Sequence, residues 1–234
     1  MSESVAAPIL ELLGALPDAA ECRLAPATLD LSITSGDFVL VEARDRLLAA
    51  EFADLCCGLL TIRQGSVRFL GRDWATSADE IAAAMRGRIG RIYGPESWIG
   101  FLSTDANILW SQLHHTRRAE SALREAAADV ARSFGLPGLP LGRPAALSDA
   151  DLLRASCVRA FVGEPQLVIL DNGELEEIAD LSSALLNAIM AMRHRYAACL
   201  WLTDGGRIWQ DRSCPATIRL RLTERGLVRV APFA

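Results

Sequence analysis

The sequence predicts a mixed α/β fold built around a parallel central sheet. Two apolar runs, residues 38–41 and 167–170, lack any polar alternation, which is typical of strands that are covered on both faces. A helical pattern precedes the second run, and Gly163 and Pro165 separate that helix from the strand. Another apolar run, residues 199–203, follows a further helical pattern. Helices and strands therefore alternate, as they do in α/β proteins.

Length and composition favour one large domain, residues 1–234. The net charge of −5 argues against a nucleic-acid-binding protein, which usually has a basic face. No apolar run approaches about 18 residues, and the N-terminus lacks the basic region of a secretory signal, so we expect neither a transmembrane helix nor a leader. The hydrophobic share of 51% indicates additional apolar surface for a partner.

Candidate metal-binding residues are scattered. None of the cysteines forms a Cys-x-x-Cys pair, so we expect buried, reduced thiols and no zinc site. The cysteines are Cys22, Cys56, Cys57, Cys157, Cys199 and Cys214. His114 and His115 are adjacent, so their rings would diverge on a helix, and we interpret them as surface residues.

Periodicity predicts the remaining elements in order. Residues 9–42 are predicted to form short strands. Residues 58–71 are predicted to form the end of a helix, a turn and a strand, and residues 89–93 are predicted to form another strand. Helices are expected at 77–87, at 105–134 (two of them) and at 175–193, and a hairpin at 218–230. Asp45 can cap a helix after the first buried strand. The predicted apolar faces of these helices are Leu48, Phe52, Leu55 and Leu59; Ile108, Leu109 and Leu113; Ala122, Leu123, Ala126, Val130 and Phe134; and Leu181, Leu185, Ile189 and Met192.

The stretch from residue 147 to residue 172, LSDADLLRASCVRAFVGEPQLVILDN, organises the chain. Ser148 can cap its helix, and Asp171 ends its strand, at the edge where open α/β sheets bind ligands. The stretch resembles the signature helix and Walker B strand of ABC transporter ATPases. That family usually begins the helix with LSGGQ and ends the strand with an Asp-Glu pair. Here the helix follows Leu147, Ser148 and Asp149, and the strand ends in Asp171 and Asn172.

Further segments carry the same resemblance, which runs from about residue 8 to about residue 230. Residues 58–71 are similar to the family's GLL…GxVxxxG segment, and residues 101–108 to its LTVxENV segment. The resemblance implies a P-loop NTPase-like ABC ATPase core with an N-terminal antiparallel β-subdomain and an inserted α-helical subdomain at about 95–150. The segment NILWSQLHH is similar to the branch that powers MCE-type (Mla-type) lipid transport.

The phosphate loop of that family is absent from the matching positions. A P-loop, GxxxxGK[ST], wraps phosphates in backbone N–H groups, and its Lys and Ser/Thr bind phosphate and Mg²⁺. The glycine positions hold Ala43 and Leu48, the Lys position holds Ala49, and the Ser/Thr position holds Ala50. We therefore expect the helix to survive as a packing element without its phosphate site.

The other chemical positions of the family have also changed. Gly94 stands where the family has the Gln that binds Mg²⁺ and water, and Asp204 stands where it has the γ-phosphate-sensing His. Asn172 replaces the Walker B Glu and cannot accept a proton as a carboxylate does. An isolated Asp171 is expected to act as a turn or cap residue. Asp149 and Asp151 would repel the nucleotide of a head-to-tail partner.

The resemblance and these losses together predict a catalytically degenerate nucleotide-binding-domain subunit of an ABC transporter. The implied partners are a multi-span permease, a second ABC ATPase subunit in a homo- or heterodimer, and an MCE protein of a lipid-transport complex, at the inner face of the cell membrane. No cofactor is expected, with weak ATP and Mg²⁺ binding left open. Two alternatives stay open: a divergent ATPase that holds phosphates with Arg44 and Arg46, and a soluble binding module that kept the fold.

Overall fold

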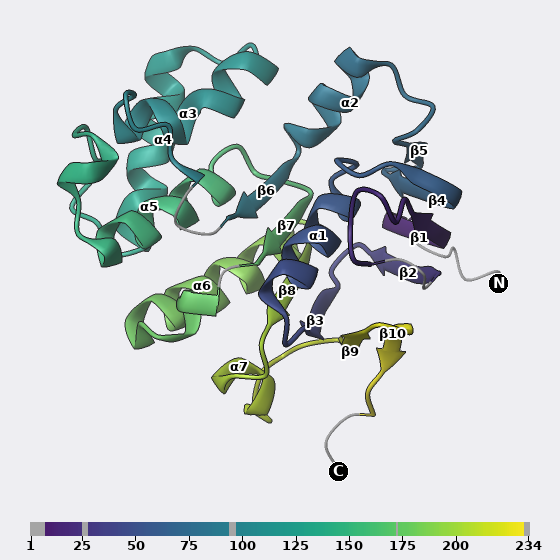
Figure 1. Ribbon diagram of the computed structural model, residues 1–234. Helices are drawn as coiled ribbons and strands as arrows, with labels where there is room; N and C mark the ends of the chain where they lie inside the picture. The colour runs from purple at the N-terminus through teal and green to yellow at the C-terminus, as the bar shows by residue number, and fades with distance from the viewer. Residues whose placement is uncertain (1–7, 25–27, 94–96, 172, 232–234) are drawn as a thin grey trace, which may run out of the picture.

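Two β-sheets and a group of helices make up the chain (Figure 1). The structure is a computed structural model that describes residues 8–24, 28–93, 97–171 and 173–231. The larger sheet has the strand order β10-β9-β3-β8-β7-β6. Its strands are β3 (Phe38–Glu42), β6 (Ile89–Ile92), β7 (Leu167–Leu170), β8 (Ala198–Thr203), β9 (Ile218–Thr223) and β10 (Gly226–Arg229). All neighbours pair in parallel except β10, which forms an antiparallel hairpin with β9.

The six-stranded sheet is covered on both faces, which explains its unbroken apolar runs. Val39 and Val41 of β3 pack on the side of helix α1 (Arg46–Cys56) and the smaller sheet. Phe38 and Leu40 of the same strand pack on the opposite side, in the core that the remaining helices complete. The predicted α/β class and its buried parallel strands are therefore confirmed.

The smaller sheet is antiparallel and has the order β2-β1-β4-β5. Its strands are β1 (Pro8–Pro17), β2 (Leu29–Thr34), β4 (Ile62–Phe69) and β5 (Arg72–Asp73). Residues from the first and third of these strands, such as Leu10 and Phe69, lie opposite each other and are fully buried. This sheet is the N-terminal antiparallel β-subdomain that the sequence predicts.

Helices gather on the side of the central sheet away from the antiparallel sheet (Figure 1). They are α3 (Thr104–His115), α4 (Glu120–Ser133), α5 (Asp149–Phe161) and α6 (Ala179–His194), with the short α7 (Arg207–Gln210) and the 3-10 turns η2 (Pro144–Ala146) and η3 (Gly173–Glu176). Helix α2 (Asp79–Arg86) leads into β6. Leu181, Leu185, Ile189 and Met192 form the fully buried face of α6, as predicted.

Some details of the predicted helices are wrong. Leu59 lies beyond the end of α1 and is 49% exposed, and Leu113 of α3 is 40% exposed. The buried face of α4 is shifted by one residue from the predicted one, so Ala127 is buried where Ala126 was expected. The last long helix begins at Ala179 rather than at residue 175, because η3 occupies the preceding turn.

Two findings bear on the compositional predictions. All six cysteines are buried and none is in a disulfide. Within the described ranges, no helix is both long and apolar enough to cross a membrane.

Candidate functional site

The carboxyl ends of three neighbouring parallel strands bring the predicted site residues to one edge of the sheet. β3 ends at Glu42, β8 ends at Thr203, and Asp171 follows β7 directly. The backbone N–H of Ala43 donates to the carbonyl of Thr203 at 2.7 Å, so the loop after β3 stays bound to the neighbouring strand. The edge is therefore where the resemblance places it.

The first turn of α1 has its free N–H groups occupied by a carboxylate of the chain itself. Oδ1 of Asp45 accepts from the N–H of Leu47 at 2.9 Å and from that of Leu48 at 3.2 Å. These are the groups that would receive an anion at a helix N-terminus. Asp45 is thus the helix cap that the sequence predicts, and its charge lies where a phosphate would bind.

The four residues at the Walker A positions contribute packing and backbone contacts. Ala43 and Ala49 are buried, and Leu48 packs against the core from a half-buried position. The carbonyl of Ala50 accepts a hydrogen bond from Nη2 of Arg91 at 3.2 Å. None of these side chains offers a donor to a phosphate.

Arg91, which the sequence analysis overlooked, lies at the centre of the site. Its Nη2 and Nε donate to Oδ2 of Asp171 at 2.6 and 3.1 Å, and its Nη1 donates to Oδ1 of Asp54 at 2.5 Å. The side chains of Arg91 and Asp171 are only 4% and 3% exposed. The guanidinium therefore ties β6, the end of β7 and α1 together. Asp171 belongs to a buried ion pair, and the expectation of a turn or cap residue is wrong.

The charges of this pair depend on each other. Burial is the largest single influence on Arg91 and opposes its charge, but Asp171, Cys57 and Asp54 together hold the pKa of the guanidinium above its usual range. Burial also raises the pKa of Asp171 above its ordinary value, although Arg91 acts in the opposite direction. Oδ1 of Asp171 is buried and has no hydrogen-bond partner among the described residues. The negative charge of the Asp171 carboxylate is thus neutralised by the guanidinium of Arg91.

A second buried carboxylate, Glu42, is also neutralised internally. Its side chain is 3% exposed; Oε1 accepts from Nε of Arg44 at 3.1 Å, and Oε2 pairs with Arg221 of β9. Glu42, Arg44 and Arg221 line a cavity of about 480 Å³ together with Asp45. Arg44 was one of the two cations offered as a substitute for the P-loop Lys, and its guanidinium is bound to Glu42 instead.

The position of the γ-phosphate sensor has a different network. Thr203 donates through Oγ1 to Oε1 of Glu176 at 2.6 Å, and Oε2 of Glu176 accepts from the N–H of Ile208 at 2.8 Å. Asp204 is exposed beside this network. Gly94 and Asn172, the other two altered catalytic positions, lie outside the described residues.

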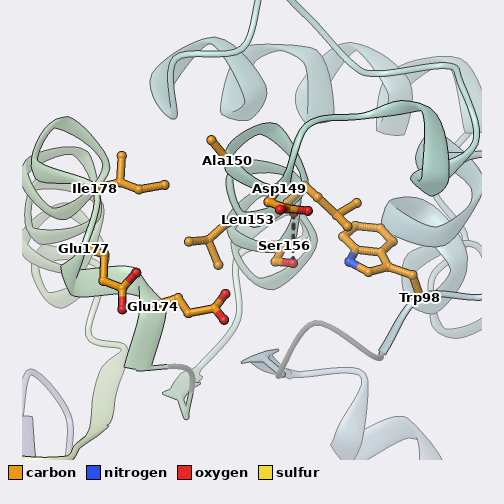
Figure 2. A pocket seen from close by; sticks show the side chains of 9 residues that line it. Trp98, Asp149, Ala150, Leu153, Ser156, Glu174, Glu177 and Ile178 are labelled. Atoms are coloured by element: carbon orange, nitrogen blue, oxygen red, sulfur yellow. Dashed lines mark hydrogen bonds between the residues drawn. The ribbon is translucent and has the colours of Figure 1, made fainter.

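Of the signature-equivalent residues, Asp149 lines a separate cavity of about 420 Å³ (Figure 2). Ser148 caps α5, since its Oγ accepts from the N–H of Asp151 at 3.2 Å. Leu147 is half-buried, and Asp149 and Ser148 are exposed. Figure 2 shows Leu153 of α5 facing Glu174 and Glu177, while Asp149 lies beside Ser156 on the side toward Trp98. The cavity is therefore bordered by carboxylates, and neither Asp171 nor the Walker A positions line it.

The described residues do not fit MgATP. Asp45 occupies the N–H groups of α1, Arg91 occupies the Asp171 carboxylate, and Ala49 cannot reach a phosphate. Mg²⁺ is usually bound by one or two carboxylates together with substrate phosphates, and the Asp171 carboxylate is already paired with Arg91 through Oδ2.

The amino-acid sequence is similar to those of known ATP-binding proteins over part of their length. No family model matches the chain. The chain is 24% identical over 143 residues to the intermembrane phospholipid transport system ATP-binding protein MlaF of Haemophilus influenzae, covering 61% of this chain and 54% of that protein. It is 28% identical over 174 residues to the nickel import ATP-binding protein NikE of Pseudomonas putida, covering 71% of this chain and 62% of that protein. The matches thus span little more than half of these relatives.

Solved structures agree on the fold. A dimeric, post-hydrolysis structure of the ATP-binding cassette MJ0796 with ADP and Pi superposes with a TM-score of 0.77 at 14% identity, covering 96% of this chain and all of that one. An ATP-binding subunit of an ABC transporter gives a TM-score of 0.76 at 16% identity, covering 95% of this chain and 90% of that one. The chain therefore has the ABC ATPase fold and resembles ABC transporter ATP-binding subunits in sequence.

Proposed function

We propose that this chain is a catalytically degenerate ABC-type subunit that works without binding or hydrolysing ATP. The observation that carries the proposal is the Asp45 carboxylate on the N–H groups of Leu47 and Leu48. An anion approaching the first turn of α1 would have to displace that carboxylate and would be repelled by its charge. Each lost charge-assisted hydrogen bond to phosphate removes about 1.5–3 kcal/mol of binding.

The pairing of Arg91 with Asp171 supports the same proposal. A metal ion at Asp171 would have to replace a buried guanidinium, which would then be left without its counter-charge. Asp149, exposed beside the N-cap of α5, brings negative charge to the surface that would face a partner's nucleotide. Both nucleotide-binding surfaces that the fold provides are therefore proposed to be inactive.

The proposed role is that of a structural or regulatory partner in an ABC transporter complex. The partners would be a multi-span permease and a second ABC ATPase subunit, at the cytoplasmic face of a membrane. Similarity to MlaF, whose name refers to phospholipid transport, supports lipids as the transported class. An MCE protein is proposed as a further partner on the sequence resemblance alone.

Calorimetric titration tests the loss of nucleotide binding. We expect ATP and ADP, each with Mg²⁺, to bind the native chain with a Kd weaker than about 1 mM. Asp45→Ala should bind ATP more tightly than the native chain does, because it frees two N–H groups and removes a negative charge. Asp73→Ala is the matched control, since Asp73 makes the same kind of bond to Ala75 at 2.9 Å far from the site. Micromolar binding by the native chain would contradict the proposal.

Two further measurements address the alternative functions. ATP turnover that disappears in Asp171→Ala would favour the divergent ATPase, whereas turnover that survives the substitution would come from a contaminant. Native mass spectrometry of the chain isolated in detergent tests the transporter role. A monomer without a membrane partner would favour the soluble binding module.

A further inference from the structure

A small cavity lies between the β9–β10 hairpin and the segment that precedes β9. Its volume is about 210 Å³, and Arg212, Arg219 and Arg229 line it. No Asp or Glu is among the described residues that line this cavity. It shares no lining residue with the two cavities described above, and the elements around it are α7, β9 and β10, at the lower end of the view in Figure 1. We call it the hairpin cavity.

The stretch of sequence around the hairpin cavity has the opposite charge to the whole chain. Residues 207–229 contain six arginines and two acidic residues, whereas the chain has a net charge of −5. The arginines are Arg207, Arg212, Arg219, Arg221, Arg225 and Arg229, and the acidic residues are Asp211 and Glu224. This local excess of positive charge would attract an anion to this part of the molecule.

Arg219 is held in a fixed orientation at the wall of the cavity. Its Nη1 donates to the carbonyl of Trp209 at 2.8 Å, and its Nη2 donates to the carbonyl of Asp211 at 3.0 Å. The guanidinium also lies over the ring of Trp209, 5.6 Å from the ring centre. Carbonyls and the indole ring carry no net charge, so these contacts orient the cation without neutralising it. A preoriented guanidinium loses little freedom when it binds the oxygens of an anion.

Two carboxylates close to the wall accept hydrogen bonds from other groups of the chain. Oδ1 of Asp211 accepts from the Oγ and the N–H of Ser213 at 2.6 and 2.8 Å, and these bonds hold the pKa of Asp211 below its usual value. Asp37 lies behind the lining residue Thr217, whose Oγ1 donates to Oδ1 of Asp37 at 3.0 Å. Oδ2 of Asp37 accepts from the N–H and the Oγ1 of Thr34, both at 2.7 Å. Neither carboxylate lines the cavity.

Arg229 completes the wall of the cavity from β10 and is exposed. The N–H of the next residue, Val230, donates to the carbonyl of Arg219 at 2.9 Å, so the backbones that carry these two arginines are adjacent. Arg221 of the same hairpin pairs with Glu42, whereas Arg229 makes no ion pair within the described ranges. An anion in the cavity would therefore bridge β9 and β10 through arginine side chains.

We propose that the hairpin cavity binds a phosphate group, held by Arg212, Arg219 and Arg229. Guanidinium groups suit this ligand, because their planar fork matches two oxygens of a phosphate. Pockets for drug-sized ligands measure about 300–1,000 Å³, so the smaller cavity favours a phosphate group over a whole nucleotide. The group would belong to inorganic phosphate or to the headgroup of a phosphomonoester lipid. The inference goes beyond the proposed function and does not depend on it.

Isothermal titration calorimetry on the full chain tests the site. Inorganic phosphate should bind the native chain with a Kd of about 1 mM or tighter. Arg229→Gln should weaken that binding about tenfold, because it removes a charge-assisted hydrogen bond to phosphate. Arg225→Gln is the matched control, since Arg225 is exposed in the turn of the same hairpin and does not line the cavity. This control removes the same charge and should change the affinity less than about twofold.

Thermal melting gives an independent readout and shows whether each variant is folded. Phosphate should raise the melting temperature of the native chain and of Arg225→Gln, because a ligand that binds only the folded state stabilises it. The same phosphate concentration should raise the melting temperature of Arg229→Gln much less. If Arg229→Gln does not fold, Arg212→Gln replaces the second exposed arginine of the cavity and decides the comparison.

Sedimentation with vesicles distinguishes the two sources of the phosphate group. The vesicles contain phosphatidylcholine with phosphatidic acid, a lipid whose headgroup is a phosphomonoester. Binding of the native chain to these vesicles, lost in Arg229→Gln, would assign the cavity to a lipid headgroup. Binding of inorganic phosphate without binding to the vesicles would assign it to a soluble ligand.

Three results would overturn the inference. They are the absence of phosphate binding to the native chain, equal phosphate affinities for the native chain and Arg229→Gln, and an equal heat from sodium chloride at matched ionic strength. Each of them leaves the proposed function standing, because that function is tested by the ATP titration. Micromolar ATP binding that persists in Arg229→Gln would instead contradict the proposed function and leave this inference intact.

Discussion

Arg91 and Asp171 show how a single side chain can replace the ligand chemistry of a site. Asp171 ends its strand at the position where the resembled family binds Mg²⁺, but here its Oδ2 accepts both Nη2 and Nε of Arg91. The same guanidinium reaches Asp54 and the carbonyl of Ala50 on α1. A protein cation thereby connects the three elements at this edge.

Removing the guanidinium should destabilise the fold more than removing the whole pair. Arg91→Met leaves the buried Asp171 carboxylate unpaired, so we expect the free energy of unfolding to fall by about 3–5 kcal/mol. The double variant Arg91→Met with Asp171→Leu should recover most of that loss, because no uncompensated charge remains. Urea denaturation measures the free energy of unfolding of the native chain, the single variant and the double variant.

Arg132→Met is the control for that series, because its exposed ion pair with Asp129 should contribute less than about 1 kcal/mol. An Arg91→Met variant that unfolds at the same urea concentration as the native chain would show that the buried pair does not stabilise this edge.

At the scale of elements, the contact between β6 and α5 brings the site together. The ideal Cβ position on Gly90 of β6 lies 1.9 Å from the carbonyl oxygen of Ala160 on α5, so only glycine allows this approach. The neighbouring Arg91 then reaches Asp171, which follows the adjacent strand β7. The packing of one strand against one helix therefore sets the position of the guanidinium.

Gly90→Ala should disrupt that contact. The added methyl group would collide with backbone rather than with a flexible side chain, so we expect a loss of about 1–3 kcal/mol or more in the free energy of unfolding. Gly138→Ala is the matched control, since a Cβ there meets nothing within 4 Å. Equal melting temperatures for the two variants would contradict the close approach between β6 and α5.

At the scale of the whole molecule, the six thiols report on the core. All are buried, and they come from the loop after β1, from α1 and its C-cap, from α5 and β8, and from the segment before β9. Burial raises the pKa of Cys57 to about 11 and raises the pKa of Cys157 and Cys199 further. The thiolate is the reactive form, so both access and ionisation protect these residues in the folded chain.

We therefore expect a thiol reagent to label the native chain very slowly at pH 8 and to label all six cysteines after unfolding in guanidinium chloride. Labelling of the unfolded chain should be fast, because free thiols return to a pKa near 8.5. Mass spectrometry counts the labels at each time. Rapid modification of Cys57 in the native chain would show that α1 opens locally, and would weaken the description of this edge as a packed unit.

The sequence by itself determined the fold class and the loss of the catalytic residue types. Unbroken apolar runs indicate buried parallel strands, and Ala49 at a Lys position needs no structure to be recognised. It also predicted Asp45 as a cap, because a cap is a contact between near neighbours in the chain. Arg91 stands within the apolar strand Ile89–Ile92. That position alone could have indicated a buried ion pair, since a buried Arg needs a carboxylate partner.

Only the tertiary structure decided which carboxylates Arg91 and Arg221 neutralise. Arg91 and Asp171 are 80 residues apart, and Arg221 and Glu42 are 179 residues apart. Periodicity reports which face of an element is buried, but it carries no information about which distant side chain lies opposite. The ion pairs at this edge follow from the order of strands in the sheet, and that order is set by packing across the whole chain.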